Sequence, residues 1–206
     1  MAIKDLTLQA FIEETGSSAP TPGGGSVAAL TASSGAALIE MVANLTIGKE
    51  KYKDVGPEMQ VIQTKTAAMK RQFLDMIDED CAAFNEIMAA YKLPKNTDEE
   101  KAIRIAHIQA ASQKAALVPF KIGETAMHLF ALAEAVIERG NTNLVTDGAV
   151  AVHNARAAVK SAFLNVKINL GSIKDQAFVE DLQKKMADME AMADEREKTI
   201  LSKVNL

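Results

Sequence analysis

The chain has 206 residues and a formal net charge of −4, from 27 acidic and 23 basic side chains. This length suits one domain with its own hydrophobic core, so we expect a single domain over residues 1–206. The charge argues against nucleic acid as a partner, because phosphate binding needs a concentrated Lys/Arg surface. The single cysteine, Cys81, cannot build an intrachain disulfide framework, and we expect a cytoplasmic protein.

The composition favours helices over strands. Aromatic residues make up 4% of the chain and tryptophan is absent, whereas hydrophobic residues make up 48% and include ten methionines. Alanine, leucine and methionine are strong helix formers. Alternating stretches of β-branched and aromatic residues, which are typical of strands, are hard to find. The sequence therefore predicts an all-α fold.

The first predicted helix follows Thr7, which can cap it, and ends near Gly16. A loop at residues 20–25 then combines two prolines with three consecutive glycines. Ser26 is the expected N-cap of a second helix. The small residues at 29–37 would let another backbone approach closely, so we expect this helix to lie at the centre of the bundle.

The uncharged run over residues 16–39 has the composition of a membrane span, but prolines and glycines occupy its first half. Only residues 26–39 remain, fewer than the roughly 20 apolar residues that a bilayer requires. We therefore expect no membrane segment. The chain also begins with acidic residues where a signal peptide would have an apolar core, so we expect no secretion signal.

Two long helical segments follow in the middle of the chain. Pro57 suits the first turn of a helix over residues 58–91. The capping box at residues 97–100 opens another helix, which we expect Pro119 to break or kink. A separate fifth helix then continues to Arg139.

The last two predicted helices cover residues 146–170 and the segment that starts at about Asp175. An apolar stripe on the final helix is a candidate contact with a partner subunit. The sequence as a whole predicts an all-α, single-domain bundle of about seven helices.

One face of the helix over 146–170 is uncharged, small and polar, with a carboxylate near its start. Asp147 and Asn165 point the same way, because eighteen residues make about five turns of helix. Asn169 lies within about 40° of that line. Two interpretations are open: a close contact between helices, or the wall of a groove that hydrogen-bonds a flat, polar heterocycle.

Asp80 lies on the apolar side of its helix, in line with Phe73, Ile77 and Phe84. A buried carboxylate must be ion-paired, hydrogen-bonded or raised in pKa, and a raised pKa makes it a usable general acid or base. Asp80 is therefore either one half of an interhelical ion pair with a lysine or arginine, or a catalytic group.

Two further segments are candidates for ligand contact. The glycines at 23–25 lead directly into a helix and lack the Gly-Lys-Ser/Thr of a nucleotide P-loop. We interpret them as a tight turn that offers backbone N–H groups and a helix N-terminus to a carboxylate or carbonyl of the ligand. Lys49 and Tyr52 belong to the basic segment 48–53, which is either a solvated turn or a holder for an anionic substrate tail.

The sequence predicts no metal site. Its three histidines are scattered and form neither His-Glu-x-x-His nor a paired Glu-x-x-His motif. No Ser-His-Asp or Cys-His arrangement follows from the spacing, and Cys81 is expected in the core.

Several segments together carry a resemblance to a known family. They are "PTPGGGSVAAL", "MVANLTIGKEKY", "IDEDCAAFNEIMAAYKLPKNTDEEK", "VPF", "GNTNLVTDGAVA" and "NVKINL", in this order between about residues 7 and 182. The chain closely resembles the cyclodeaminase/cyclohydrolase family of folate enzymes. The resemblance implies an all-helical homodimer with a folate site in a cleft near the subunit interface. It also implies no metal, nucleotide or cofactor beyond the tetrahydrofolate substrate.

The resemblance implies a formimidoyltetrahydrofolate cyclodeaminase, which closes 5-formiminotetrahydrofolate to 5,10-methenyltetrahydrofolate and releases ammonia. The alternative is a methenyltetrahydrofolate cyclohydrolase, which interconverts the methenyl and 10-formyl forms. No single residue separates the two, but "LPKNTDEEK" and "NVKINL" look more like the cyclodeaminase. A further alternative is a non-catalytic, folate-binding helical dimer.

With this resemblance, we assign roles to the candidate residues as hypotheses. Asp80 and Asp147 would carry the proton transfers of the reaction. The substrate would be bound by the glycine loop, the basic segment and the uncharged helix face. These residues are Pro22, Gly23, Gly24, Gly25, Ser26, Lys49, Tyr52, Asn165 and Asn169.

Overall fold

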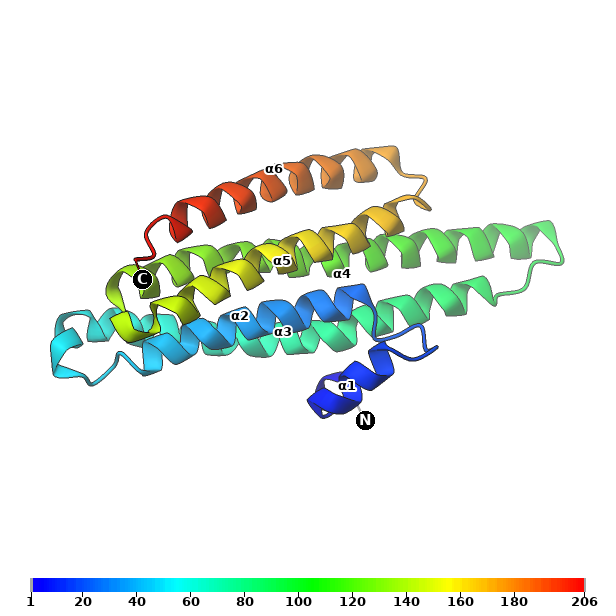
Figure 1. Cartoon of the computed structure of the whole chain (residues 1–206). Helices are drawn as coiled ribbons and strands as arrows, with labels where there is room; N and C mark the ends of the chain where they lie inside the picture. Colours follow the sequence, from blue (N-terminus) through cyan, green and yellow to red (C-terminus); the bar gives the residue numbers. More distant parts are fainter. Residues whose placement is uncertain (1, 206) are drawn as a thin grey trace.

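Long helices lie side by side to form an elongated bundle in the computed structural model, which describes residues 2–205 (Figure 1). Within these residues there are six α-helices, three short 3-10 helices and no strand. In chain order they are η1 (Ile3–Asp5), α1 (Leu8–Thr15), α2 (Gly24–Asn44), η2 (Glu50–Val55), α3 (Gly56–Tyr91), α4 (Asp98–Arg139), η3 (Thr142–Leu144), α5 (Val145–Leu170) and α6 (Gln176–Leu201). The predicted all-α class is confirmed.

The expected break at Pro119 is wrong, and this explains why the described chain has six α-helices instead of about seven. Pro119 lies inside α4, which continues through it from Asp98 to Arg139. A proline has no N–H, so the carbonyl of Ala115, four residues earlier, loses its usual donor. The side-chain amide of Asn169 on α5 donates to this carbonyl at 2.8 Å. A neighbouring helix therefore supplies the donor that the proline lacks.

Side-chain caps start α1, α4 and α6, whereas α2, α3 and α5 begin without one. The Thr7 side chain accepts a hydrogen bond from the first turn of α1, and Thr97 with Glu100 forms the predicted capping box of α4. The prediction that Ser26 caps α2 is wrong. Gly23 is the N-cap, without a side-chain cap bond, and Ser26 lies inside the first turn.

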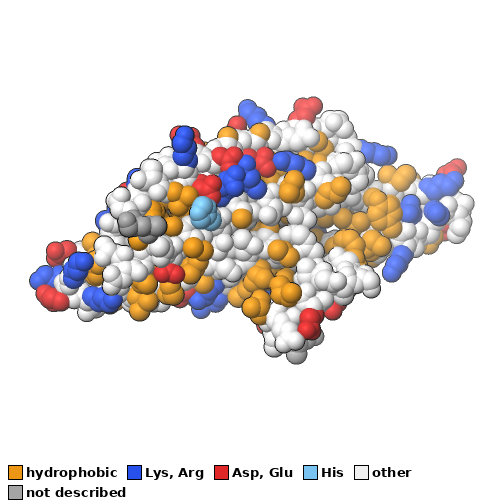
Figure 2. Space-filling view, viewed as in Figure 1, with side chains coloured by type: hydrophobic (Ala, Val, Ile, Leu, Met, Phe, Trp, Pro, Cys, Tyr) orange, Lys and Arg blue, Asp and Glu red, His pale blue; other side chains and the backbone are white. Residues whose placement is uncertain are grey.

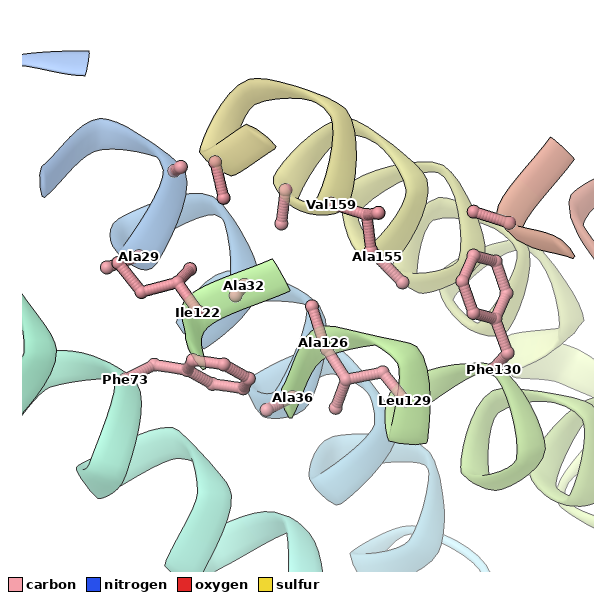
Figure 3. Packing of buried hydrophobic residues seen from close by; sticks show 14 of the residues in the cluster. Ala29, Ala32, Ala36, Phe73, Ile122, Ala126, Leu129, Phe130, Ala155 and Val159 are labelled. Atoms are coloured by element: carbon pink, nitrogen blue, oxygen red, sulfur yellow. The ribbon is translucent and has the colours of Figure 1, made fainter. Parts of the chain in front are cut away.

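The central helix is α2, as its small residues predicted. Ala29, Ala32 and Ala36 are fully buried against neighbouring helices, and Figure 3 shows them near Phe73 of α3 and Ile122 of α4. Small side chains allow this close approach. In the described chain, α2 is also the one helix long and apolar enough to cross a membrane, but 56% of that segment is buried inside the bundle. Its apolar character is that of a core helix.

The final helix packs on its own chain. The stripe that the sequence offered to a partner subunit is buried here, with Leu182, Met186 and Ala193 at most 3% exposed. Ion pairs between α5 and α6 flank it, such as Lys160 to Asp194 at 2.6 Å. These pairs are half-exposed and screened by solvent, so they contribute little, and the apolar stripe holds α6 in place.

Candidate functional site

A pocket of about 290 Å³ opens where the glycine loop before α2 meets α3 and the C-terminal end of α5. Six of the predicted site residues line it: Gly23, Gly24, Gly25, Asp80, Asn165 and Asn169. Residues that were not predicted as site residues complete the wall: Pro20, Thr21, Ala83, Phe84, Ile87, Ala115 and Ile168. The C-terminal part of the uncharged face of α5 therefore lines a pocket, whereas Ala158 farther back on the same face is fully buried.

Some of these additional wall residues carried a sequence signal. Phe84 was recognised as lying on the same stripe as Asp80, and Ile87 follows it one turn later. No sequence pattern marked Ala115 as a site residue. It lies in the wall because α5 packs beside it and Asn169 donates to its backbone carbonyl. Apolar residues beside a carboxyl group and two amides are the usual composition of a small-molecule site.

The other pockets lack such convergent polar groups. The pocket of about 380 Å³ between α3 and α4 contains Glu86 and Lys114, but these form an ion pair with each other at 2.5 Å. A cavity of about 480 Å³ farther along the same two helices is lined mainly by apolar side chains, with Lys65 and His128 at its edge. The pocket at the start of α2 is therefore the best candidate for a polar ligand.

Asp80 is the acidic group of this pocket. The hydroxyl of Ser26 donates to its Oδ2 atom at 2.8 Å, and the same hydroxyl lies 3.4 Å from the Cys81 sulfur. Burial raises the pKa of the Asp80 carboxyl above its ordinary value, and hydrogen bonds from the Ser26 side chain and backbone partly offset this. No lysine or arginine among residues 2–205 makes an ion pair with it, so the ion-pair interpretation is wrong.

The glycines allow the first turn of α2 to touch the pocket side chains directly. A Cβ atom at Gly25 would lie 2.2 Å from Oδ1 of Asp80, and one at Gly24 would lie 2.9 Å from Oδ1 of Asn165. Such distances leave no room for a methyl group at Gly25 unless the carboxyl moves. Gly24 and Gly25 thus act through close approach, whereas a Cβ atom at Gly23 would meet only an ordinary contact at 3.6 Å.

The two asparagines are held by backbone carbonyls. Nδ2 of Asn165 donates to the carbonyl of Ser161, and Nδ2 of Asn169 donates to the carbonyl of Ala115, both at 2.8 Å. Only the NH₂ group of an amide can donate, so these bonds identify which side-chain atom is nitrogen. Each Oδ1 atom is left as a hydrogen-bond acceptor for another group.

Three predicted residues lie away from this pocket: Lys49, Tyr52 and Asp147. Asp147 is in the first turn of α5, eighteen residues before Asn165, so the two lie about 27 Å apart along the helix axis. Figure 1 shows the start of α5 at the opposite end of the bundle from the start of α2. The angular argument placed both side chains on one face but ignored this translation. Asp80 and Asp147 of one chain therefore do not share a pocket.

Tyr52 ties two loops together at that opposite end. Its hydroxyl accepts a hydrogen bond from the Thr142 backbone N–H at 3.0 Å and lies 3.1 Å from the Thr142 hydroxyl. These bonds lower the pKa of Tyr52 to about 8. The backbone N–H of Asn141 also donates to Thr46 at 2.9 Å. The segment after α2 is thus fastened to the loop between α4 and α5.

The remaining predicted positions support the pocket from outside its lining. Pro22 is buried just before the glycines, and Ser26 is fully buried behind Asp80. In residues 2–205 no three His, Cys, Asp or Glu side chains come together as a metal-holding group. The expectation that the reaction needs no cofactor beyond its substrate stays a prediction.

Comparison with known proteins places the chain. The profile of the family described as "Formiminotransferase-cyclodeaminase" matches residues 7–188. The chain belongs to this family. It is 43% identical to the methenyltetrahydrofolate cyclohydrolase of Methylorubrum extorquens, over 97% of this chain and 98% of that protein. It also resembles the crystal structure of formiminotetrahydrofolate cyclodeaminase from Thermotoga maritima, with a TM-score of 0.87, 30% identity, and coverage of 98% of this chain and 97% of that one.

Longer relatives contain the same domain. The formimidoyltransferase-cyclodeaminase of Rattus norvegicus is 34% identical over 91% of this chain. The match covers 35% of that protein, so the chain spans about a third of the length of this relative. The family predicted from sequence motifs is confirmed.

Replacing Gly25 with alanine should displace the Asp80 carboxyl while the helix remains, because the new methyl group would overlap Oδ1. A displacement of about 1 Å in a reacting group can cost about 100-fold in turnover, and we expect a loss of that order. Steady-state kinetics and circular dichroism measure the two effects. Gly16→Ala is the control, since its Cβ would meet only ordinary contacts at 3.5 Å or more. Full activity in Gly25→Ala would show that the close approach is dispensable.

Replacing Asp80 with asparagine should change how stability depends on pH. Because burial raises the pKa of Asp80 in the folded state, the folded protein holds this proton more tightly than the unfolded chain. The free energy of unfolding should therefore fall in the wild type, relative to Asp80→Asn, as pH rises from the ordinary aspartate range through the raised pKa. Urea denaturation at a series of pH values measures the difference. A difference independent of pH would contradict the raised pKa.

Proposed function

We propose that the chain is a folate one-carbon enzyme that forms or consumes the 5,10-methenyl ring of tetrahydrofolate. The observation that carries the proposal is the pocket at the start of α2, where a carboxyl group with a raised pKa meets two oriented amides in a member of this family. A carboxyl with a raised pKa keeps its proton to higher pH than an exposed aspartate and can act as a general acid.

The first candidate reaction is the cyclodeaminase reaction. Ring closure forms a bond from N10 to the formimino carbon and breaks the bond from that carbon to its terminal nitrogen, which leaves as ammonia. The leaving nitrogen must gain protons, and N10 must lose one. Asp80 can do both in sequence. The neutral acid protonates the formimino nitrogen as N10 attacks, and the carboxylate so formed accepts the N10 proton. Asp80 then passes this proton to the same nitrogen, which leaves as ammonia, and solvent reprotonates the carboxylate. The likeness to the Thermotoga maritima cyclodeaminase structure over nearly the whole chain supports this candidate.

The second candidate is the cyclohydrolase reaction, which the 43% identity to the Methylorubrum extorquens cyclohydrolase favours. Water attacks the methenyl carbon, the bond from that carbon to N5 breaks, and the formyl group stays on N10. Here Asp80 as a carboxylate would accept one proton from the attacking water and pass it to N5, and the second water proton leaves to solvent as the formyl C=O forms. Both reactions use the same pocket and the same carboxyl group.

We also propose that two copies of the chain form the complete site. The outer face of α2 and α5 exposes large apolar side chains to solvent. They include Val27, Val150, Leu164 and Ile168, which are 36–77% exposed. Figure 2 shows hydrophobic side chains on this face beside α1 and toward the C-terminal end of α5. Ile168 also lines the pocket, so a contact there would place the pocket at the interface.

An antiparallel two-fold contact along this face would explain why the predicted residues form two groups. In such a dimer, one end of α5 lies beside the other end of the partner's α5. The end that carries Lys49, Tyr52 and Asp147 would then meet the partner's pocket around Asp80. Asp147 would act on the substrate only from the partner subunit.

The activity is tested by the absorbance of the methenyl group. Ring formation and ammonia release from 5-formiminotetrahydrofolate would identify a cyclodeaminase, and accelerated loss of 5,10-methenyltetrahydrofolate alone would identify a cyclohydrolase. In either case Asp80→Asn should reduce turnover by about 10²- to 10⁴-fold, the usual contribution of a general acid or base. Wild-type turnover in this variant would refute the role of Asp80. If the wild type binds folate but turns over neither substrate, the chain is a non-catalytic folate-binding protein.

The shared site is tested by mixing two inactive variants, Asp80→Asn and Asp147→Asn. Random exchange of subunits between two-fold dimers makes half of them mixed, and each mixed dimer has one site with both aspartates intact. The mixture should therefore recover about a quarter of wild-type activity. The separate variants, measured at the same total concentration, are the controls. No recovery despite confirmed subunit exchange would show that Asp147 does not act in the partner's site and would overturn the shared-site proposal.

A further inference from the structure

A proline inside α4 and an asparagine on α5 meet at one backbone carbonyl. Pro119 offers no N–H to the carbonyl of Ala115, and the Nδ2 atom of Asn169 donates to that carbonyl at 2.8 Å. Ala115 and Asn169 both line the pocket, whereas Pro119 is buried behind them. The backbone carbonyl that Pro119 leaves without its helical donor therefore accepts a hydrogen bond at the wall of the candidate site.

This contact determines which end of the Asn169 amide is free. One N–H of its NH₂ group donates to Ala115, which fixes the orientation of the amide and leaves Oδ1 free as an acceptor for a ligand. Asn165, one turn earlier, is oriented in the same way by the carbonyl of Ser161. The two asparagines therefore offer two oriented acceptors, one helical turn apart, and each keeps one further N–H.

We propose that Pro119 is a positioning residue that holds Asn169 with its carbonyl oxygen available to the substrate. The inference rests on the proposed function, because two neighbouring acceptors suit the amino-pyrimidine edge of a pterin, which carries neighbouring N–H groups. With an alanine at position 119, the backbone N–H would bond to the Ala115 carbonyl and compete there with Asn169, which weakens the contact that orients the amide.

A purely structural role does not account for this proline. Proline is the least favourable residue in the interior of a helix, because it removes a hydrogen bond and its ring crowds the preceding turn. Alanine at this position would serve α4 better. The proposal therefore predicts that Pro119→Ala keeps or raises thermal stability while it weakens ligand binding, whereas a structural role predicts lower stability and unchanged binding.

The experiment compares the wild type with Pro119→Ala by three measurements. The side-chain NH₂ signal of Asn169 in ¹⁵N-labelled protein, assigned by its loss in Asn169→Asp, should move toward its solvent-exposed position. The Kd for 5-formyltetrahydrofolate and the KM should rise by up to about tenfold, as for the loss of one hydrogen bond, with a smaller change in kcat. The melting temperature should stay or rise. Pro57→Ala is the matched control, because Pro57 lies in the first turn of α3 where no carbonyl is freed.

An unchanged Asn169 signal in Pro119→Ala would overturn the positioning role, whatever the activity. If Pro119→Ala does not fold, Asn169→Asp decides the matter, because a carboxylate cannot donate to Ala115. This variant should weaken binding of 5-formyltetrahydrofolate at least as much, and unchanged binding would overturn the proposal. If the wild type itself fails to bind this folate, the proposed function fails, and the amide signal still reports separately on the role of Pro119.

Discussion

The close approach of α2 to its neighbours is the constraint on which the rest of the structure depends. Its buried face is made mostly of alanine, serine and glycine, with Ile39 and Val42 near its C-terminal end, so the backbones of neighbouring helices come near its N-terminal half without large α2 side chains between them. At its first turn this packing continues without any Cβ atom, and Gly25 lies directly against Asp80. The same constraint that makes α2 a core helix therefore also forms the floor of the pocket.

This packing gives Asp80 its chemistry. The carboxyl group is covered by the start of α2, and within residues 2–205 its hydrogen-bond partner there is Ser26. Without a nearby cation the charged form is disfavoured, so the pKa rises. An ion pair with a lysine or arginine would instead have stabilised the charged carboxylate and lowered its pKa. The arrangement thus suits a group that must hold and release a proton during one reaction.

The sequence predicted the parts of this fold that local rules govern. The caps at Thr7 and Thr97 and the helix class follow from short-range patterns, and the structure agrees with them. The break at Pro119 was wrong because a donor 50 residues away in sequence, on Asn169, satisfies the carbonyl that the proline leaves. No local rule contains that contact.

Only part of the site could be predicted, because short-range patterns identify residues within one segment but not how distant segments come together. Residues near the start of α2 were identified as a group, because the glycine loop and the stripe of Asp80 carry signals in short segments. Asp147 was joined to them by helical angle, which repeats every five turns and says nothing about distance along the axis. Position along the axis, and the presence of a partner subunit, are set by tertiary and quaternary packing.

The short helix α1 is attached to the bundle by fewer buried side chains than the long helices are. Phe11 is its one buried side chain, while Leu8 and Ile12 on the same helix are 68% and 57% exposed. A segment with so few buried contacts opens locally at a small fraction of the free energy of global unfolding. The loop from α1 to α2 carries Pro20 and Thr21, which form the outer wall of the pocket. Release of a single aromatic anchor would therefore widen the entrance to the pocket while the four-helix framework around α2 stays folded.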